Sequence, residues 1–155
     1  AGDINVASEH LVSNVIQSIL IRDCEQYRAK PHYPIVLLTT PEEETHVLGL
    51  LIGACELAQA GARLINLGPR LSPREIVDAT RQSRADIVAL SVLDVPEGNQ
   101  RSFLRRLKEG LDPSTQIWLG GNGAVRDEPG CEVLALHEVG LRIRAIGEQR
   151  QANAR

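Results

Sequence analysis

The residues best suited to chemistry are Glu44 and His46, in the segment Thr40–Gly49. A neutral imidazole that donates one N–H to a carboxylate is held in one orientation, and its other nitrogen becomes a better electron-pair donor. Residues two positions apart do not share a helix face, but a turn in a loop can bring them together. The pair therefore predicts a histidine prepared to bind a metal. The alternative interpretation is that Glu42 to Glu44 are solvated acidic residues at the positive end of a helix dipole.

Small residues follow or face the same region. Ser91 ends an apolar run of strand length, and its hydroxyl would point into the crevice there, although a serine in this position is commonplace. Gly120 and Gly121 follow another such run, where they would let a flat ligand approach the backbone; a plain tight turn explains them equally well. Gly49 and Gly53 lie inside an expected helix. Each glycine there destabilises the helix by about 1 kcal/mol relative to alanine. They indicate either a ligand against that helix or close helix–sheet packing.

A strand–helix alternation has to position these residues. Apolar runs predict strands at 35–39, 63–67, 86–92, 115–119 and 141–146, with helices at 47–60, 99–109 and 131–139 and one that begins after Ser72. Continuous apolar strands separated by helices indicate an α/β fold with a parallel sheet covered on both faces. Right-handed crossovers then predict a doubly wound, flavodoxin-like or Rossmann-like five-stranded sheet in the order 2-1-3-4-5. Its ligand crevice lies at the carboxyl ends of strands one and three.

Composition excludes several classes of protein. The chain has 155 residues, of which 43% are hydrophobic, so one compact domain is expected. A net charge of −3 and an aromatic content of 3% argue against direct contact with nucleic acid. No apolar run is long enough for a membrane span, no export signal opens the chain, and the three cysteines have no zinc spacing, so we expect a cytoplasmic protein. The sequence lacks a glycine-rich phosphate loop, a GxSxG elbow and an HExxH pair, and we expect no enzyme activity.

Residues 1–26 form a separate region, which a polar linker at 27–34 joins to the domain at 35–155. Residues 4–26 read as one amphipathic helix with an apolar stripe through Val12, Ile16 and Leu20. Glu9 falls on the same stripe, where either a polar ligand or the helix dipole would stabilise it. Burying one such aliphatic side chain is worth about 1.5–3 kcal/mol. We therefore predict that the chain is part of a longer protein, or that this helix packs against another copy or another protein segment.

Taken together, ExHxxG at 44–49, SxL at 91–93 and GG at 120–121 resemble the signature of the cobalamin-binding domain family. The resemblance covers residues 35–147. It implies that His46 is the lower ligand of cobalt, in place of the dimethylbenzimidazole base of the cofactor, and that Glu44 hydrogen-bonds His46.

The same resemblance assigns residues to the tail of the cofactor, which threads into the domain in this family. Gly49 would make room for the tail, and Ser91 would hydrogen-bond the displaced benzimidazole. Leu93 completes the SxL motif, while Gly120 and Gly121 would line the tail channel.

Within the family, the chain looks most like light-sensing cobalamin-dependent regulators of the MerR type. Glu9 and His10 match the Glu-His pair on the last helix of the helical bundle that caps the corrinoid, so this bundle would be incomplete here. For His10, a solvated or helix-packing role is the alternative. The implied cofactor is adenosylcobalamin, with methyl- or hydroxocobalamin as further forms. Two other functions stay open: a corrinoid carrier in methyl transfer, and a sensor that binds haem through His46.

Overall fold

Five parallel strands form one sheet in the order β2-β1-β3-β4-β5, as predicted. The computed structural model describes the backbone of residues 6–25 and 33–153, and the side chains of 11–22, 33–150 and 152. The strands are β1 (Ile35–Thr39), β2 (Arg63–Asn66), β3 (Ile87–Ser91), β4 (Gln116–Gly120) and β5 (Cys131–Val133). Because β1 and β3 are neighbours, the order reverses between them, and the crevice for a ligand is expected at their carboxyl ends.

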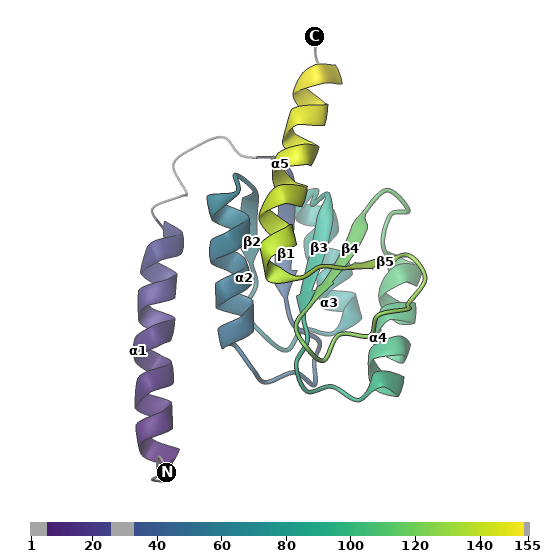
Figure 1. Ribbon diagram of the computed structural model, residues 1–155. Helices are drawn as coiled ribbons and strands as arrows, with labels where there is room; N and C mark the ends of the chain where they lie inside the picture. The colour runs from purple at the N-terminus through teal and green to yellow at the C-terminus, as the bar shows by residue number, and fades with distance from the viewer. Residues whose placement is uncertain (1–5, 26–32, 154–155) are drawn as a thin grey trace.

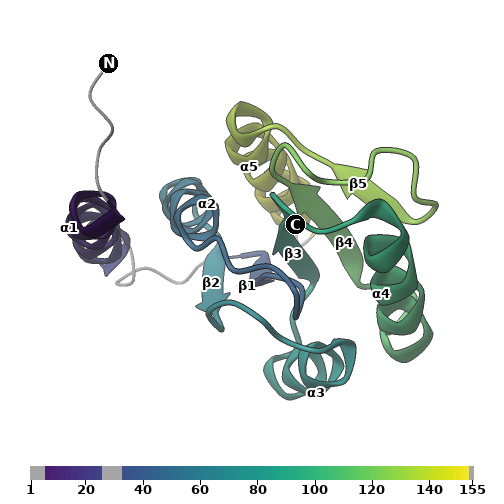
Figure 2. The same cartoon turned by 90° about the horizontal axis from the view of Figure 1, so that it is seen from below.

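Helices cover both faces of the sheet (Figures 1 and 2). The helices are α1 (Val6–Glu25), α2 (Leu48–Gln59), α3 (Pro73–Ser83), α4 (Glu97–Gly110) and α5 (Leu136–Asn153). Helices α2 and α5 lie on one face, α3 and α4 lie on the other, and α1 stands outside α2. None of the helices that the structure describes is long and apolar enough to cross a membrane.

The alternation of side chains along each strand divides the core into two clusters. On β1, Val36 packs with the α2 and α5 side, and Leu37 packs with the α3 and α4 side. Leu50 and Trp118 belong to the first cluster, and Leu107 belongs to the second. Both faces of the sheet are therefore buried, which is why its strands are continuously apolar.

Helix α3 begins after Ser72, as predicted, and a capping box forms its start. The Ser72 hydroxyl accepts a hydrogen bond from the Glu75 amide at 3.4 Å, and the Glu75 carboxylate accepts one from the Ser72 amide at 2.8 Å. Pro73 occupies the first helical position, where its missing N–H costs nothing.

The prediction for residues 131–146 was wrong except at 136–139, where the predicted helix is present. The structure has strand β5 at Cys131–Val133 where a helix was expected, and helix α5 where a strand was expected at 141–146. Leu141 and Ile143 alternate with arginines as in a strand, but Leu141 is 62% exposed. Val139, Ile143 and Ile146, spaced as on one helix face, pack against the core instead.

Helix α1 confirms the predicted N-terminal helix over its described residues, and it lies beside α2. The Cys55 thiol of α2 donates a hydrogen bond to the Leu20 carbonyl at 3.3 Å. The N-terminal turns of α1 reach past the loops at the carboxyl ends of the strands (Figure 1). Four apolar side chains of α1 are each more than half exposed: Leu11, Val12, Val15 and Ile19.

Candidate cofactor-binding site

The centre of the candidate site is the carboxylate of Glu44, in the loop between β1 and α2. Its side chain is 1% exposed and accepts four hydrogen bonds. One oxygen accepts from the His46 amide at 2.9 Å and from His46 Nδ1 at 2.6 Å. The other accepts from the amides of Leu93 at 2.6 Å and Asp94 at 2.8 Å, just beyond β3. One buried carboxylate thus joins the ends of the two central strands.

These hydrogen bonds fix the charge of Glu44. Burial raises the pKa of this carboxyl, but the amides of Asp94, His46 and Leu93 and the His46 ring outweigh burial and lower it to about 2. Glu44 is therefore an anion at neutral pH, and an anionic carboxylate only accepts hydrogen bonds.

His46 is held with one nitrogen free. Because the Glu44 carboxylate only accepts, Nδ1 of His46 donates in this pair, and Nε2 is the ring nitrogen left for another partner. The side chain is 50% exposed, and Nε2 has no hydrogen-bond partner among the described residues. An oriented, accessible imidazole nitrogen backed by a carboxylate suits a single axial bond to a metal. Among the described residues, no three histidine, cysteine or acidic side chains gather into a metal site.

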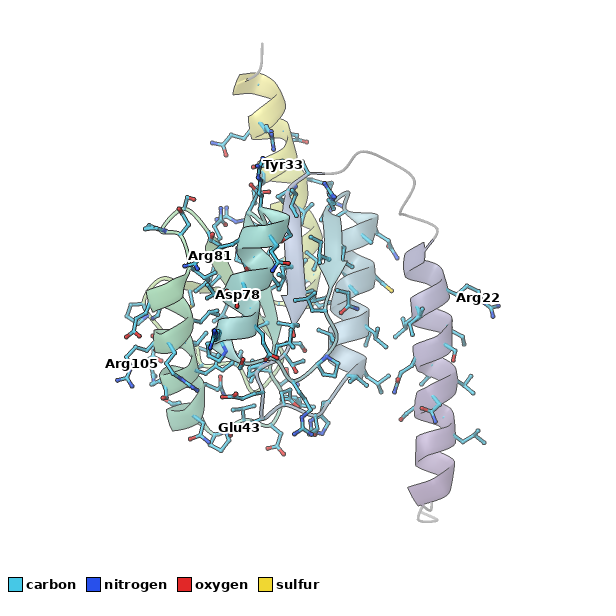
Figure 3. All side chains as sticks on the ribbon, turned by 180° about the vertical axis from the view of Figure 1, so that it is seen from behind. Arg22, Tyr33, Glu43, Asp78, Arg81 and Arg105 are labelled. Atoms are coloured by element: carbon cyan, nitrogen blue, oxygen red, sulfur yellow. The ribbon has the colours of Figure 1, made fainter. Side chains whose placement is uncertain are left out.

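The neighbouring acidic residues are not a helix start, so that alternative interpretation is wrong. Helix α2 begins at Leu48 and has no acidic residue in its first turn. Glu42 forms an ion pair with Arg106 of α4 at 3.1 Å, and Glu43 accepts a hydrogen bond from the Asn99 side chain at 2.7 Å. Figure 3 shows Glu43 at the loop end of the molecule. Each of the three glutamates has its own partner, and the loop is clamped to α4.

Two buried threonines at the end of β1 connect the loop that holds Glu44 to the loop after β2, and the sequence did not predict them. Thr40 Oγ1 accepts from the Arg70 amide at 2.9 Å and lies 3.2 Å from the Glu44 carbonyl, to which it donates. Thr39 Oγ1 donates to the Gly68 carbonyl at 2.7 Å. The available signal was a pair of polar residues at the end of an apolar strand.

Gln100 of α4 was also missed. Its side chain is buried, and Nε2 donates to the carbonyls of Val95 at 2.6 Å and Gly123 at 2.7 Å. Its Oε1 accepts from the Val125 amide at 3.0 Å. One amide group thereby fastens the loop after β3 to the loop after β4.

Close approaches of the backbone account for two of the predicted glycines. A Cβ on Gly49 would lie 3.1 Å from Ser91 Oγ, so α2 and the end of β3 are in contact there. Gly121 has φ +100, and a Cβ on it would lie 2.1 Å from the Val92 carbonyl oxygen. A Cβ on Gly120 would meet only the Leu134 carbonyl, at 3.9 Å.

These residues surround a cavity of about 200 Å³. Its walls come from α2, the ends of β3 and β4, and the start of α5; they include Gly49, Gly53, Ser91, Gly120 and Gly121. The other lining side chains are apolar except for Trp118, whose Nε1 donates to Gln116 at 3.1 Å. The Ser91 hydroxyl is therefore the polar group that the cavity walls offer to a ligand.

Of the nine predicted site residues, four line this cavity, and Glu44 and His46 lie in the loop between β1 and α2. The Leu93 side chain is 49% exposed, and its contribution described here is the amide that binds Glu44. Glu9 and His10 belong to the backbone of α1, but their side chains lie outside the described residues.

The chain is similar in sequence to a known transcriptional repressor and to a subunit of glutamate mutase. The chain is 33% identical over 138 residues to the HTH-type transcriptional repressor CarH of Myxococcus xanthus, a match that covers 88% of this chain and 46% of the repressor. It is 30% identical over 121 residues to glutamate mutase sigma subunit 2 of Haloarcula marismortui, covering 77% of this chain and 76% of that subunit. The chain thus spans about half the length of the repressor.

Solved structures share the fold. A cobalamin-binding protein from Desulfitobacterium hafniense superimposes with a TM-score of 0.60 at 20% identity, covering 83% of this chain and 70% of that one. The monomethylamine corrinoid protein of Methanosarcina barkeri superimposes with a TM-score of 0.63 at 16% identity, and the match covers 90% of this chain and 67% of that protein. Residues 34–154 match the family described as the B12 binding domain. On the strength of that match, the chain belongs to the B12-binding domain family.

Proposed function

We propose that this chain is the cobalamin-binding sensory part of a transcriptional regulator, with His46 as the lower axial ligand of cobalt. The observation that carries the proposal is the Glu44–His46 pair, which presents one free imidazole nitrogen at the carboxyl end of β1. Family membership and the similarity to CarH support the choice of ligand and of a regulatory role.

The residues of the candidate site fit this cofactor. His46 Nε2 would bind the lower face of the corrin, and the cavity beside Gly49 would take the dimethylbenzimidazole tail. The Ser91 hydroxyl would hydrogen-bond the tail, while Gly120 and Gly121 would line its channel. When bound, adenosylcobalamin supplies a cobalt–carbon bond that light can break. In the proposed role the chain binds and reports the state of the cofactor and performs no catalysis of its own.

The remaining parts of the chain have proposed roles in the same scheme. Residues 35–155 would hold the cofactor, and residues 1–26 would contribute the last helix of a cap over its upper face, including Glu9 and His10. The apolar side chains exposed on α1 support contact with another copy or another protein segment. A net charge of −3 supports the proposal that this chain does not itself bind DNA.

Absorption spectroscopy tests the ligand assignment. The purified chain is titrated with hydroxo-, methyl- and adenosylcobalamin, and separately with haemin. We expect spectra of the form in which histidine replaces the benzimidazole, and we expect His46→Ala to abolish them. His137→Ala, which removes an exposed histidine of α5, is the matched control. A His46→Ala spectrum like that of the wild type would contradict the assignment, and binding of haemin alone would favour the haem sensor.

Two further measurements separate the regulatory role from the carrier role. The adenosylcobalamin complex is illuminated, and its mass in solution is compared with that of a sample kept in the dark. A change in mass supports a light-responsive regulator. Transfer of a methyl group from the methylcobalamin complex to a thiol acceptor, with a methyltransferase present, would support the carrier instead.

A further inference from the structure

Gly53 is a glycine that contacts among the described residues do not explain. It lies in the middle of α2, one helical turn after Gly49, and both residues line the cavity. A Cβ built on Gly53 meets no heavy atom of the described residues within 4 Å. Glycine in a helix interior destabilises the helix relative to alanine, and the packing of the described residues does not explain why glycine stands here.

Two other glycines at the cavity have explanations within the protein, whereas a Cβ on Gly120 would meet only the Leu134 carbonyl at 3.9 Å. A Cβ on Gly49 would press on Ser91 Oγ at 3.1 Å, and a Cβ on Gly121 would collide with the Val92 carbonyl. Gly53 differs from Gly49 and Gly121 because its missing side chain leaves space that no atom of the described residues fills. Gly53 lines the cavity, whose walls also include Trp118 of β4.

The cavity is small enough for one added methyl group to affect which ligand fits in it. About 200 Å³ is smaller than the roughly 300–1,000 Å³ of pockets that enclose a whole drug-sized ligand. The cavity therefore suits one fused ring system of a larger ligand. Its apolar walls, with the Ser91 hydroxyl as the polar group on offer, favour a flat ring with few hydrogen-bonding atoms.

We propose that Gly53 is a specificity-determining residue, whose lack of a side chain sets the width of the cavity for the heteroaromatic base at the end of the cofactor tail. This inference rests on the proposed binding of cobalamin. Gly53 acts on the tail alone, so it discriminates between corrinoids with and without a base and leaves the His46 contact with cobalt unchanged.

The test compares Gly53→Ala and Gly53→Val with wild type in the full 155-residue chain. Each protein is titrated with cobalamin and with cobinamide, which has the corrin ring but no base. Gly98→Ala is the matched control, because a Cβ there also meets nothing within 4 Å and Gly98, in the first turn of α4, lies outside the cavity. We expect Gly53→Val to weaken cobalamin binding by about 5- to 100-fold, as overpacking does in a filled site, and Gly53→Ala to weaken it less.

Two readouts keep a folding defect apart from the proposal. Without ligand, Gly53→Ala should raise Tm by roughly 1–4 °C, because alanine restricts the unfolded chain and suits the helix. Cobinamide should bind all four proteins equally, or none of them. Unchanged cobalamin affinity in both Gly53 variants, or equal losses for cobalamin and cobinamide, would overturn the inference. Failure of wild type to bind cobalamin at all would instead overturn the proposed function.

Discussion

A single carboxylate connects the two halves of the candidate site. Glu44 holds the His46 ring with one oxygen and the start of the loop after β3 with the other. A buried charge is costly without partners, and here four donors compensate it. A displacement of His46 is therefore resisted by the backbone of Leu93 and Asp94 as well as by its own loop.

Replacing Glu44 by glutamine tests this connection. An amide of the same shape has one acceptor atom instead of two, so at least one of the buried donors loses its partner. We expect Glu44→Gln to lower the free energy of unfolding by about 1–3 kcal/mol, measured by urea denaturation. The spectrum of the histidine-bound cobalamin complex should weaken as well, since Nδ1 is no longer held by a carboxylate.

The control for this substitution is Glu43→Gln. Glu43 is exposed, with a described hydrogen bond to the Asn99 side chain. Its substitution should change the free energy of unfolding by less than about 0.5 kcal/mol. Equal effects of the two substitutions would show that the shared position of Glu44 between β1 and β3 is unimportant.

At the residue scale, sequence analysis found the groups that motifs carry and missed those that depend on tertiary contacts. The contact between Glu44 and His46 was predicted because both lie in one short loop. Thr40 and Gln100 were not, because their partners belong to distant segments, the loops after β2 and β4. A local sequence pattern does not predict a hydrogen bond between segments that are distant in the sequence.

At the scale of elements, α4 is the support for the loops around the site. Arg106 and Asn99 hold the loop after β1, and Gln100 holds the loops after β3 and β4. Farther along, Arg101 forms ion pairs with Asp127 at 2.6 Å and Glu128 at 3.0 Å. The segment before β5 is thus attached to the helix by charge.

Glu128 makes this attachment sensitive to pH. Its side chain is 10% exposed, and the hydrogen bond from Lys108, with a further contribution from Arg101, lowers the pKa of its carboxyl below the usual 4.5. The folded state therefore favours the anion, and the stability this provides is present above about pH 4.5 and is lost as the pH falls.

We expect Glu128→Gln to reduce the dependence of the unfolding free energy on pH between about pH 6 and 3, measured by urea denaturation at each pH. Glu109→Gln, at an exposed position of α4 with no ion pair among the described side chains, is the control and should retain the dependence of wild type. A Glu128→Gln profile parallel to that of wild type would contradict the prediction.

The elements themselves were predicted where burial is strong. Strands β1, β3 and β4 are largely apolar runs, and helices α2, α3 and α4 lie where they were predicted, although α4 begins two residues earlier. The prediction failed at 131–135 and 141–146 because β5 is only three residues long and α5 packs with apolar residues whose spacing also resembles a strand. Contact with β4, which is not a local property, selects the strand.

At the scale of the whole molecule, α1 stands out because none of its described side chains, at 11–22, is buried. It meets α2 along one side, and Leu11, Val12, Val15 and Ile19 remain more than half exposed. Adjacent exposed apolar side chains on a helix are typical of a surface that binds another protein segment.

We expect the isolated chain to self-associate through this surface as its concentration rises, because burying each of these side chains is worth about 1.5–3 kcal/mol. Sedimentation velocity should show a lower mass for the double variant Val15→Glu/Ile19→Glu than for wild type at the same concentration. Asn14→Glu, an exposed polar position of the same helix, is the control. A wild-type chain that stays monomeric over the whole range would contradict the prediction.

The two edges of the sheet bear on how such contacts can form. The edge strands β2 and β5 have only four and three residues; Arg63 and Asn66 are exposed on β2, and Glu132 of β5 is paired with Arg142 at 3.2 Å. Short, charged edges are poor templates for a foreign strand, and they protect a parallel sheet against edge-to-edge aggregation. At high concentration, this protein should therefore form reversible assemblies through helix α1 and not cross-β fibres.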